Sequence, residues 1–372
     1  MKKVLFLVGS LHGGGAEKVL VDTINHLDRK KYQITIQTLF DEGIFKKELL
    51  SHIRYKTIIT CSPGICRRIV AKILFFVLGP RITYRWFIRD EYDYEIAFLE
   101  GLPTKIISES TNPKARKIAW VHTDLEKFPD SSRAFGSERK EAEAYNRFDQ
   151  IFCVSGAVMR AFLNKYPVVK IPTDVLYNVI DEEKIIMASQ RPVVLPTNIK
   201  PCFISAGRLV EQKGYDRLLR IHKRLIEEGC VHSLIILGEG ELFKELEAYI
   251  LDNNLQNTAF LLGFKKNPYK YFNKADCFIC SSYAEGFSTV ISESVLCGTP
   301  VIGTDVAGNR EPEEAPRCSL IVENDEDALF EALLAVLKNP SILAQYRKEL
   351  PERQAFLKKE NLLSVFESKV FS

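Results

Sequence analysis

The sequence predicts an α/β protein with two Rossmann-like domains, each built on a doubly wound parallel sheet. Short apolar stretches alternate with helical patterns along most of the 372 residues, which is typical of parallel sheets covered by helices. The alternation runs through two series, and a proline-containing stretch at 190–201 separates them. With 46% hydrophobic and 27% charged residues, the chain has the composition of a globular protein, which excludes a disordered chain.

The first series predicts five buried strands in a first domain at 1–183. Each strand is a short apolar run, as expected where both faces of a parallel sheet are covered. The expected strands are Val4–Val8, Ile34–Leu39, Tyr94–Leu99, Lys117–Val121 and Gln150–Val154.

The second series predicts six strands in a second domain at 184–350. Three prolines in the stretch 190–201 oppose a continuous helix or central strand, so we expect a linker there. The expected strands are Cys202–Gly207, Ser233–Leu237, Thr258–Leu262, Cys277–Cys280, Pro300–Gly303 and Leu320–Val322. The remainder, 351–372, is expected to form a helix that packs back on the first domain. Ligands of such folds bind outside the carboxyl ends of the strands, so two facing domains imply a cleft.

Charge and cysteine content exclude several classes of protein. The 51 Lys and Arg residues against 48 Asp and Glu residues give a net charge of +3, too balanced to indicate nucleic-acid binding. Nine scattered cysteines are typical of buried thiols in a reducing compartment. Cys277 and Cys280 have redox or zinc spacing, but a spacing of three in a strand points them to opposite faces. We therefore expect no metal site.

The N-terminus resembles a signal peptide only superficially. The apolar run after Lys3 is short and is followed by Gly13–Gly15 rather than by a cleavage site, so a buried strand and a glycine loop explain it better. No apolar run approaches the roughly 20 residues that span a bilayer.

The segment 54–89 breaks the overall charge balance. Between Glu48 and Asp90 there is no acidic residue, and aromatic and aliphatic residues alternate with eight cations. The cations are Arg54, Lys56, Arg67, Arg68, Lys72, Arg81, Arg85 and Arg89. The pattern fits a basic amphipathic helix pair on an anionic membrane. It also fits an ordinary helix whose apolar side joins the core, and nucleic acid is a weaker third interpretation because no recognised binding motif accompanies it.

A glycine loop follows the first expected strand. Gly13, Gly14 and Gly15 precede a helix, where backbone amides and the helix dipole favour a phosphate. A nicotinamide-binding loop is the rival interpretation, but the spacing differs from G-x-G-x-x-G. A tight turn that binds nothing is the third.

Charged residues follow two strands of the second domain. Arg208 and Lys213 come after the strand that ends near Gly207, where two cations can compensate the charge of a leaving diphosphate. Glu285 and Glu293 are eight residues apart. If a helix starts near Thr289, the first glutamate lies in the loop before it and the second lies one turn inside, with phosphate-binding amides between them. A solvated charge pair remains the alternative for either glutamate.

Together these motifs resemble the retaining nucleotide-sugar glycosyltransferases of family 4, which have the two-domain GT-B fold. The matching elements are Gly14–Glu17, Gly207–Leu209 with Lys213–Gly214, Gly238–Gly240, Gly263–Phe264, Ala275–Asp276, Glu285–Glu293 and Gly298–Val301. The runs at 97–105 and 120–124 look like those of enzymes that build bacterial capsular polysaccharide and exopolysaccharide.

The resemblance implies roles for individual residues. It places Arg208 and Lys213 on the donor diphosphate, and Glu285 and His122 on the donor sugar near the reacting carbon. It places Glu293 on the ribose. Further donor-binding positions are Gly14, Gly15, Gly263, Phe264, Gly286, Phe287, Ser288, Thr289 and Val290.

The expected reaction is transfer of a hexose-type sugar, with retention, from a UDP-sugar or a GDP-sugar to a saccharide on a polyprenyl diphosphate. The resemblance implies no metal or other cofactor and a cytoplasmic protein, peripheral on the inner face of the membrane. Asp325-Glu-Asp327 matches a metal-binding pattern of another fold, but here it precedes a helical pattern and is expected to cap that helix. The alternatives are a non-catalytic nucleotide-sugar-binding subunit, a related epimerase or phosphorylase and, more remotely, an NAD dehydrogenase.

Overall fold

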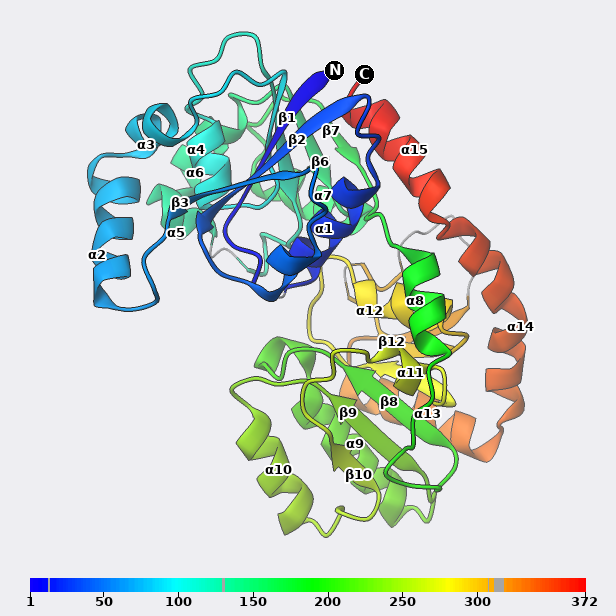
Figure 1. Ribbon diagram of the computed structural model, residues 1–372. Coiled ribbons are helices and arrows are strands. Elements are labelled where there is room, and N and C mark those ends of the chain that lie inside the picture. The colour runs from blue at the N-terminus through cyan, green and yellow to red at the C-terminus, as the bar shows by residue number, and fades with distance from the viewer. Residues whose placement is uncertain (13, 129–130, 307, 311–317) are drawn as a thin grey trace. The chain divides into compact units, whose positions relative to one another are not determined.

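The structure is a computed structural model that describes residues 1–12, 14–128, 131–306, 308–310 and 318–372 (Figure 1). It divides into two compact units, Met1–Ile180 with Leu362–Ser372, and Asp181–Asn361. The sequence analysis places these divisions at 183/184 and 350/351.

The first unit is a parallel sheet with helices. Its strands run in the order β3-β2-β1-β4-β5-β6-β7, so the strand order reverses between β1 and β4. The strands are β1 Lys2–Val8, β2 Tyr32–Phe40, β3 Arg54–Ile59, β4 Tyr94–Ala97, β5 Arg116–Val121, β6 Gln150–Cys153 and β7 Thr173–Val175. The helices are α1 Gly15–His26, η1 Ile44–Glu48, α2 Ile65–Lys72, the π-helical η2 Ile73–Val77, α3 Pro80–Phe87, α4 Leu102–Ile107, α5 Ser132–Phe135, α6 Glu138–Tyr145 and α7 Gly156–Lys165.

The second unit repeats this plan. Its sheet has the order β10-β9-β8-β11-β12-β13 with all pairs parallel, and the order reverses between β8 and β11. The strands are β8 Cys202–Ala206, β9 Ser233–Leu237, β10 Ala259–Leu261, β11 Cys277–Cys280, β12 Val301–Thr304 and β13 Ser319–Val322. The helices are α8 Glu182–Ser189, η4 Glu211–Lys213, α9 Tyr215–Glu227, α10 Phe243–Asp252, α11 Tyr269–Phe272, α12 Thr289–Leu296, α13 Glu326–Lys338 and α14 Ser341–Phe356. Helix α15, Lys359–Val370, leads into the last residues of the first unit.

The predicted fold class is confirmed, and each of the eleven expected strands overlaps an observed one. The prediction for 54–89 was wrong at its start, because Arg54–Ile59 is the edge strand β3 rather than part of a helix pair. An edge strand tolerates cations, and the β-branched residues Thr57, Ile58 and Ile59 favour extended backbone. The short edge strand β7 was also missed.

Of three local predictions, two are confirmed and one is confirmed in part. The stretch 190–201 contains neither helix nor strand, but it lies within the second unit, which starts at Asp181, and is therefore not a linker between the two units. Asp325 caps α13, since its carboxylate accepts hydrogen bonds from the backbone amides of Asp327 and Ala328 at 2.9 and 3.1 Å. Cys277 and Cys280 lie in the buried strand β11 as free thiols.

The last residues of the chain complete the core of the first unit. Phe366 of α15 packs on Trp120 of β5, with ring centroids 5.5 Å apart, and Phe371 packs on Tyr32 and Tyr94. Among the described residues, no helix combines the length and the apolar character needed to cross a bilayer.

Candidate functional site

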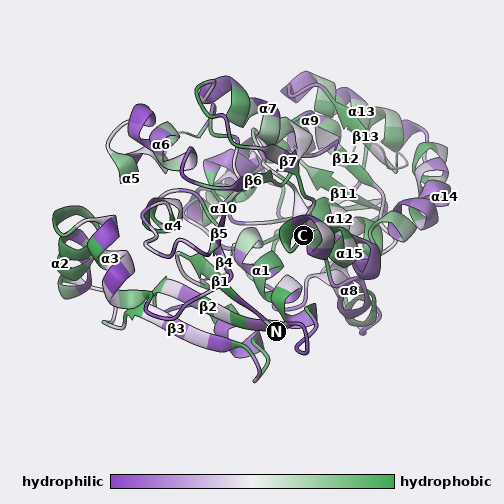
Figure 2. Cartoon of the chain, turned by 90° about the horizontal axis from the view of Figure 1, so that it is seen from above, coloured by the Kyte–Doolittle hydropathy of each residue, from purple (hydrophilic) through white to green (hydrophobic). Residues whose placement is uncertain are grey.

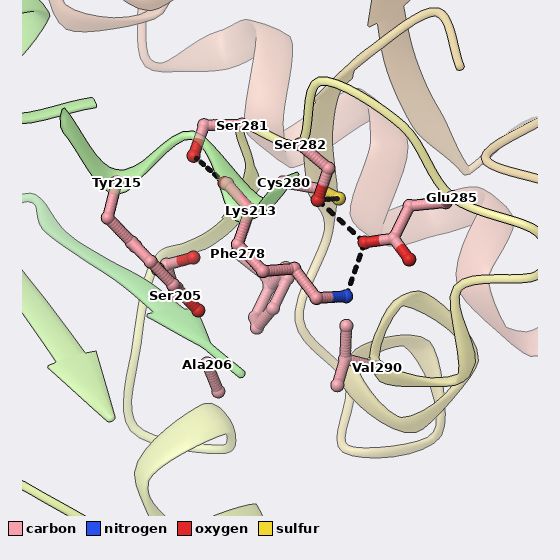
Figure 3. A pocket seen from close by; sticks show the side chains of 10 residues that line it. All are labelled: Ser205, Ala206, Lys213, Tyr215, Phe278, Cys280, Ser281, Ser282, Glu285 and Val290. Atoms are coloured by element: carbon pink, nitrogen blue, oxygen red, sulfur yellow. Dashed lines mark hydrogen bonds and ion pairs between the residues drawn. The ribbon is translucent and has the colours of Figure 1, made fainter. Parts of the chain in front are cut away.

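Two of the charged residues predicted in the second unit, Lys213 and Glu285, meet at the point where its strand order reverses. The neighbouring strands β8 and β11 each end in a loop, residues 207–214 and 281–288 respectively. Ligands of doubly wound sheets bind at this position. A pocket there is lined by residues of both loops, including Lys213, Ser282 and Glu285, and by Val290 of α12 (Figure 3).

An ion pair joins the two loops directly. Lys213 Nζ lies 2.5 Å from Glu285 Oε1, and the Ser282 hydroxyl donates a hydrogen bond to the same oxygen at 2.6 Å (Figure 3). The Glu285 side chain is 8% exposed and that of Lys213 is 21% exposed. The structure therefore brings together, in a mostly buried pair, two of the four residues predicted to contact the donor diphosphate or the donor sugar.

Backbone groups reinforce this connection. The amide of Tyr283 donates to the Gln212 carbonyl at 2.8 Å, and the Gln212 side chain donates to the Ala284 carbonyl at 2.9 Å. Gly214 has a φ of +62°, and a Cβ atom on it would lie 2.1 Å from the Ser281 carbonyl oxygen. Only glycine therefore fits the close approach of these loops.

A buried cation lies behind the loops. The guanidinium of Arg217, on α9, donates to the carbonyls of Ser281 and Ser282 at 2.7 and 2.6 Å and to the Asn324 side chain at 2.8 Å. The residue is 2% exposed, and burial lowers its pKa. Arg217 fixes the backbone immediately before Glu285, and the sequence analysis missed it. Its position on the apolar side of a helix could have indicated a structural role, because arginine is rarely buried without a partner.

Helix α12 begins at Thr289, which meets the condition set in the sequence analysis, with Glu285 in the loop before it and Glu293 inside it. Glu293 is 7% exposed, and the Tyr269 hydroxyl donates to its Oε1 at 3.4 Å. Gly308 packs behind this loop, where a Cβ atom would lie 2.3 Å from the Gly286 carbonyl oxygen and 2.6 Å from Phe287 Cα. The segment 286–290 therefore has little room to move toward Gly308.

Other predicted donor-binding residues surround these loops. Arg208 is exposed and forms no ion pair with the residues that the structure describes. Gly263 follows β10 with a φ of +70°, and its carbonyl accepts a hydrogen bond from Gly238 at the end of β9. Phe264 is 56% exposed, so much of its side chain is open to contact.

In the first unit, the loops after β4 and β5 are tied by a carboxylate. Glu100 Oε1 accepts hydrogen bonds from the backbone amides of His122 and Thr123 at 2.6 and 2.7 Å. Burial raises the pKa of Glu100, and the two amides oppose this shift. Glu100 lies in the run at 97–105, and the sequence analysis gave it no role. Its position directly after a strand that neighbours the strand of His122 was the available signal.

His122 is held as a neutral imidazole. Some surface of the residue is exposed, but Nε2 is buried and has no hydrogen-bond partner in the described structure. Burial lowers the pKa of His122 to about 3, and a hydrogen bond to the Phe98 backbone opposes this shift. The Phe98 and Trp120 rings pack against it, with centroids 4.8 and 6.5 Å away. Nε2 is therefore a buried acceptor whose hydrogen-bonding capacity the described residues leave unused.

The glycine loop is partly described. Gly13 lies outside the described residues, Gly14 is the N-cap of α1, and Gly15 is its first residue. A Cβ atom on Gly14 would lie 2.1 Å from the Glu17 carboxylate, so this carboxylate lies over the start of α1. A helix N-terminus attracts an anion, and in this structure the side chain of Glu17 takes that place.

Comparisons with known proteins identify the family. Residues 13–184 match the family described as Glycosyltransferase Family 4, and residues 188–353 match Glycosyl transferases group 1. The chain is 33% identical to N-acetylgalactosamine-N,N'-diacetylbacillosaminyl-diphospho-undecaprenol 4-alpha-N-acetylgalactosaminyltransferase of Campylobacter jejuni, over 95% of both chains. The chain is a family 4 glycosyltransferase.

Further similarities extend this assignment. The transferase is 30% identical to UDP-Gal:alpha-D-GlcNAc-diphosphoundecaprenol alpha-1,3-galactosyltransferase of Escherichia coli, over 36% of each chain. HepE of Anabaena, solved with UDP and glucose, superposes with a TM-score of 0.75 at 20% identity over the full length of both chains. Sucrose-phosphate synthase of Thermosynechococcus elongatus gives a TM-score of 0.76 at 18% identity, over 100% of this chain and 98% of that one. The predicted GT-B fold is confirmed.

Replacing Arg217 tests its role behind the loops. Arg217→Met leaves the Ser281 and Ser282 carbonyls and the Asn324 side chain without their donor, so we expect the second unit to lose about 3–5 kcal/mol of stability. Hydrogen exchange measured by mass spectrometry should also quicken in peptides covering 281–288. The control is Arg220→Met on the same helix, where a side chain 41% exposed forms surface ion pairs and contributes under about 1 kcal/mol. Equal effects of the two substitutions would contradict the role of Arg217.

The neutral state of His122 predicts a pH dependence of stability. Because its folded pKa is about 3 and its unfolded pKa is near 6.5, the folded state should lose stability as pH falls from 6.5 toward 3. Both tryptophans, Trp86 and Trp120, belong to the first unit, so fluorescence during urea unfolding follows that unit alone. His122→Gln should flatten the pH dependence of its midpoint. His222→Gln, which removes a buried histidine of the second unit, should leave it unchanged. An unchanged slope in His122→Gln would contradict the buried neutral imidazole.

Proposed function

We propose that this transferase moves a hexose-type sugar from a UDP-sugar to a hydroxyl of a saccharide carried on a polyprenyl diphosphate, with retention at the anomeric carbon. The observation that carries the proposal is the Lys213–Glu285 pair at the ends of β8 and β11, within loops that match the family's donor-binding motifs. A GDP-sugar is the second choice of donor.

The names of relatives support the acceptor class. The Campylobacter and Escherichia relatives are both named for transfer to a saccharide on diphospho-undecaprenol. The Escherichia relative is also named for a UDP-sugar donor, and HepE was solved with UDP. We extend both properties to this chain, with a cytoplasmic location peripheral to the inner face of the membrane.

The charges on the loops suit departure of a diphosphate. In our proposal, Lys213 and Arg208 contact the donor diphosphate and stabilise the negative charge that grows on it as its bond to the anomeric carbon breaks. Glu285 exchanges its contact with Lys213 for the donor-sugar hydroxyls. The segment 286–290 contributes amides to the diphosphate, Glu293 holds the ribose, and Gly263 and Phe264 border the base.

The first unit contributes His122 to the donor sugar. Its imidazole is neutral and its buried Nε2 has no partner among the described residues. In our proposal, Nε2 becomes accessible when the donor binds and accepts a hydrogen bond from a sugar hydroxyl. The acceptor hydroxyl attacks on the face from which the diphosphate leaves. A new carbon–oxygen bond replaces the old one, and the acceptor proton passes to an oxygen of the leaving diphosphate. In this scheme the two cations supply the charge compensation that a divalent metal ion supplies elsewhere.

Transfer should depend on the charged loops of the second unit. We expect Arg208→Ala and Glu285→Gln to lower the rate of UDP release on a synthetic polyprenyl-diphosphate saccharide by about 10²–10³-fold. The matched control is Arg224→Ala, which removes an exposed arginine on α9 that pairs with Asp327, and it should retain the wild-type rate. EDTA should leave the rate unchanged. Mass spectrometry and NMR of the product should show one added hexose in the configuration that it had in the donor.

Other products would identify the rival functions. Isomerised donor or a free sugar phosphate in place of a lengthened glycan would indicate an epimerase or a phosphorylase. Binding of nucleotide sugar without turnover, over a full panel of donors and acceptors, would indicate a non-catalytic subunit. Wild-type transfer by both site variants would contradict the assignment of the site.

A further inference from the structure

The segment from α2 to α3 exposes an unusual number of apolar side chains. Seven of them are between 37% and 75% exposed. We use the name hairpin surface for these seven side chains together with the exposed arginine and lysine side chains of the same segment. The apolar members are Ile65, Ile69, Ile73, Phe76, Val77, Ile82 and Trp86. In both views the two helices lie beside each other at one edge of the first unit (Figures 1 and 2).

These seven residues do not lie on the side of the helices that packs on the core. Leu74 and Phe75 are the buried residues of η2, and Thr83 and Tyr84 are those of α3, whereas α2 has no buried residue. Ile65, Ile69 and Ile73 follow one another at intervals of four, and so do Ile82 and Trp86. Each helix therefore carries an outward apolar stripe, since residues four apart share a helix face. The interpretation that the apolar side of 54–89 only joins the core was therefore wrong for these residues.

Most cations of this segment form no ion pair with a carboxylate of the described residues. Of the eight basic residues between Glu48 and Asp90, Arg54 and Lys56 pair with Asp90, and Arg67 pairs with Glu42. The remaining five form no ion pair with any described residue, and all five are exposed. These five are Arg68, Lys72, Arg81, Arg85 and Arg89.

We propose that the hairpin surface docks on an anionic lipid bilayer, with the apolar stripes in the acyl–headgroup boundary and the five cations at the lipid phosphates. This inference rests on the proposed function, because a polyprenyl-linked acceptor is confined to a membrane. Apolar side chains flanked by arginine and lysine are the combination that holds interfacial helices to anionic membranes. A soluble acidic partner would be matched by the cations but would leave the seven apolar side chains unexplained.

The hairpin surface is packed against the elements of the first unit that carry its candidate site. Helix α3 packs on α4. Lys105 Nζ, on α4, lies over the exposed ring of Phe76, 5.4 Å from its centroid. Helix α4 begins two residues after Glu100, whose carboxylate holds the backbone of His122. Docking through the hairpin therefore holds this edge of the first unit at the surface where the acceptor's head group emerges.

Vesicle co-sedimentation of the full chain tests the proposal without nucleotide or acceptor. We expect binding to vesicles of phosphatidylcholine with 30% phosphatidylglycerol, weak binding to phosphatidylcholine alone, and a marked loss at 1 M salt, where the screening length falls to about 3 Å. Arg81→Gln with Arg85→Gln should weaken binding roughly 30-fold, the loss expected for two cations near an anionic surface. Ile69→Gln with Phe76→Gln should weaken it at least tenfold, and the deficit should persist at low salt.

Matched controls remove similar groups elsewhere. Lys244→Gln with Lys348→Gln removes two exposed cations of the second unit, and Met187→Gln with Leu251→Gln removes exposed apolar side chains of α8 and α10. Both should bind vesicles like the wild type. All hairpin variants should retain the unfolding midpoint of the first unit, because the replaced side chains are exposed.

Several outcomes would overturn the inference. One is wild-type vesicle binding by both hairpin variants. Another is absent binding together with hairpin-dependent self-association in analytical ultracentrifugation, which would make this surface a contact between copies. Hairpin-dependent binding of a DNA duplex without vesicle binding would likewise overturn it. The test is separate from the proposed function, because vesicle binding needs no turnover and transfer can be measured on a water-soluble short-chain acceptor.

Discussion

The ion pair between Lys213 and Glu285 is the interaction on which the candidate site depends. It is formed by side chains from two loops that are 72 residues apart in the sequence, at the point where the strand order of the second sheet reverses. Each side chain neutralises the other in a mostly buried position, where a lone charge would be costly. A ligand that carries both anionic groups and hydroxyls can replace each partner with its own groups. This arrangement is compatible with the diphosphate sugar that we propose as the donor.

In each unit a charged side chain holds the backbone of a loop by hydrogen bonds, and the two side chains have opposite charges. In the second unit the buried guanidinium of Arg217 donates hydrogen bonds to backbone carbonyls just before Glu285 in the sequence. In the first unit the Glu100 carboxylate accepts hydrogen bonds from the backbone amides of His122 and Thr123. In both cases a charged side chain satisfies backbone groups where a strand ends. A loop without regular hydrogen bonds thus acquires a fixed shape.

The sequence was sufficient for the elements that are long, apolar or rich in glycine. The strand β11 follows from a local pattern and was predicted correctly, and α12 starts at Thr289, the position that the sequence analysis assumed for it. The edge strand β3 was missed because Arg54 and Lys56 give its start the composition of a surface helix, although its β-branched residues and its pairing with β2 make it a strand. Arg217 and Glu100 were missed because most of their partners are backbone groups of other elements, which the sequence does not identify. Only their positions, on the apolar side of a helix and after a strand, indicated a role. Whether the apolar residues of 65–86 face the core or the solvent is likewise set by tertiary packing.

The most direct test of the central claim is calorimetric titration of UDP into the wild type and into Lys213→Gln. If the Lys213–Glu285 pair forms the diphosphate site, the substitution should weaken UDP binding by at least tenfold and leave binding of uridine, which has no phosphate, unchanged. Equal affinity of the two proteins for UDP would contradict the account, and so would equal losses for UDP and uridine.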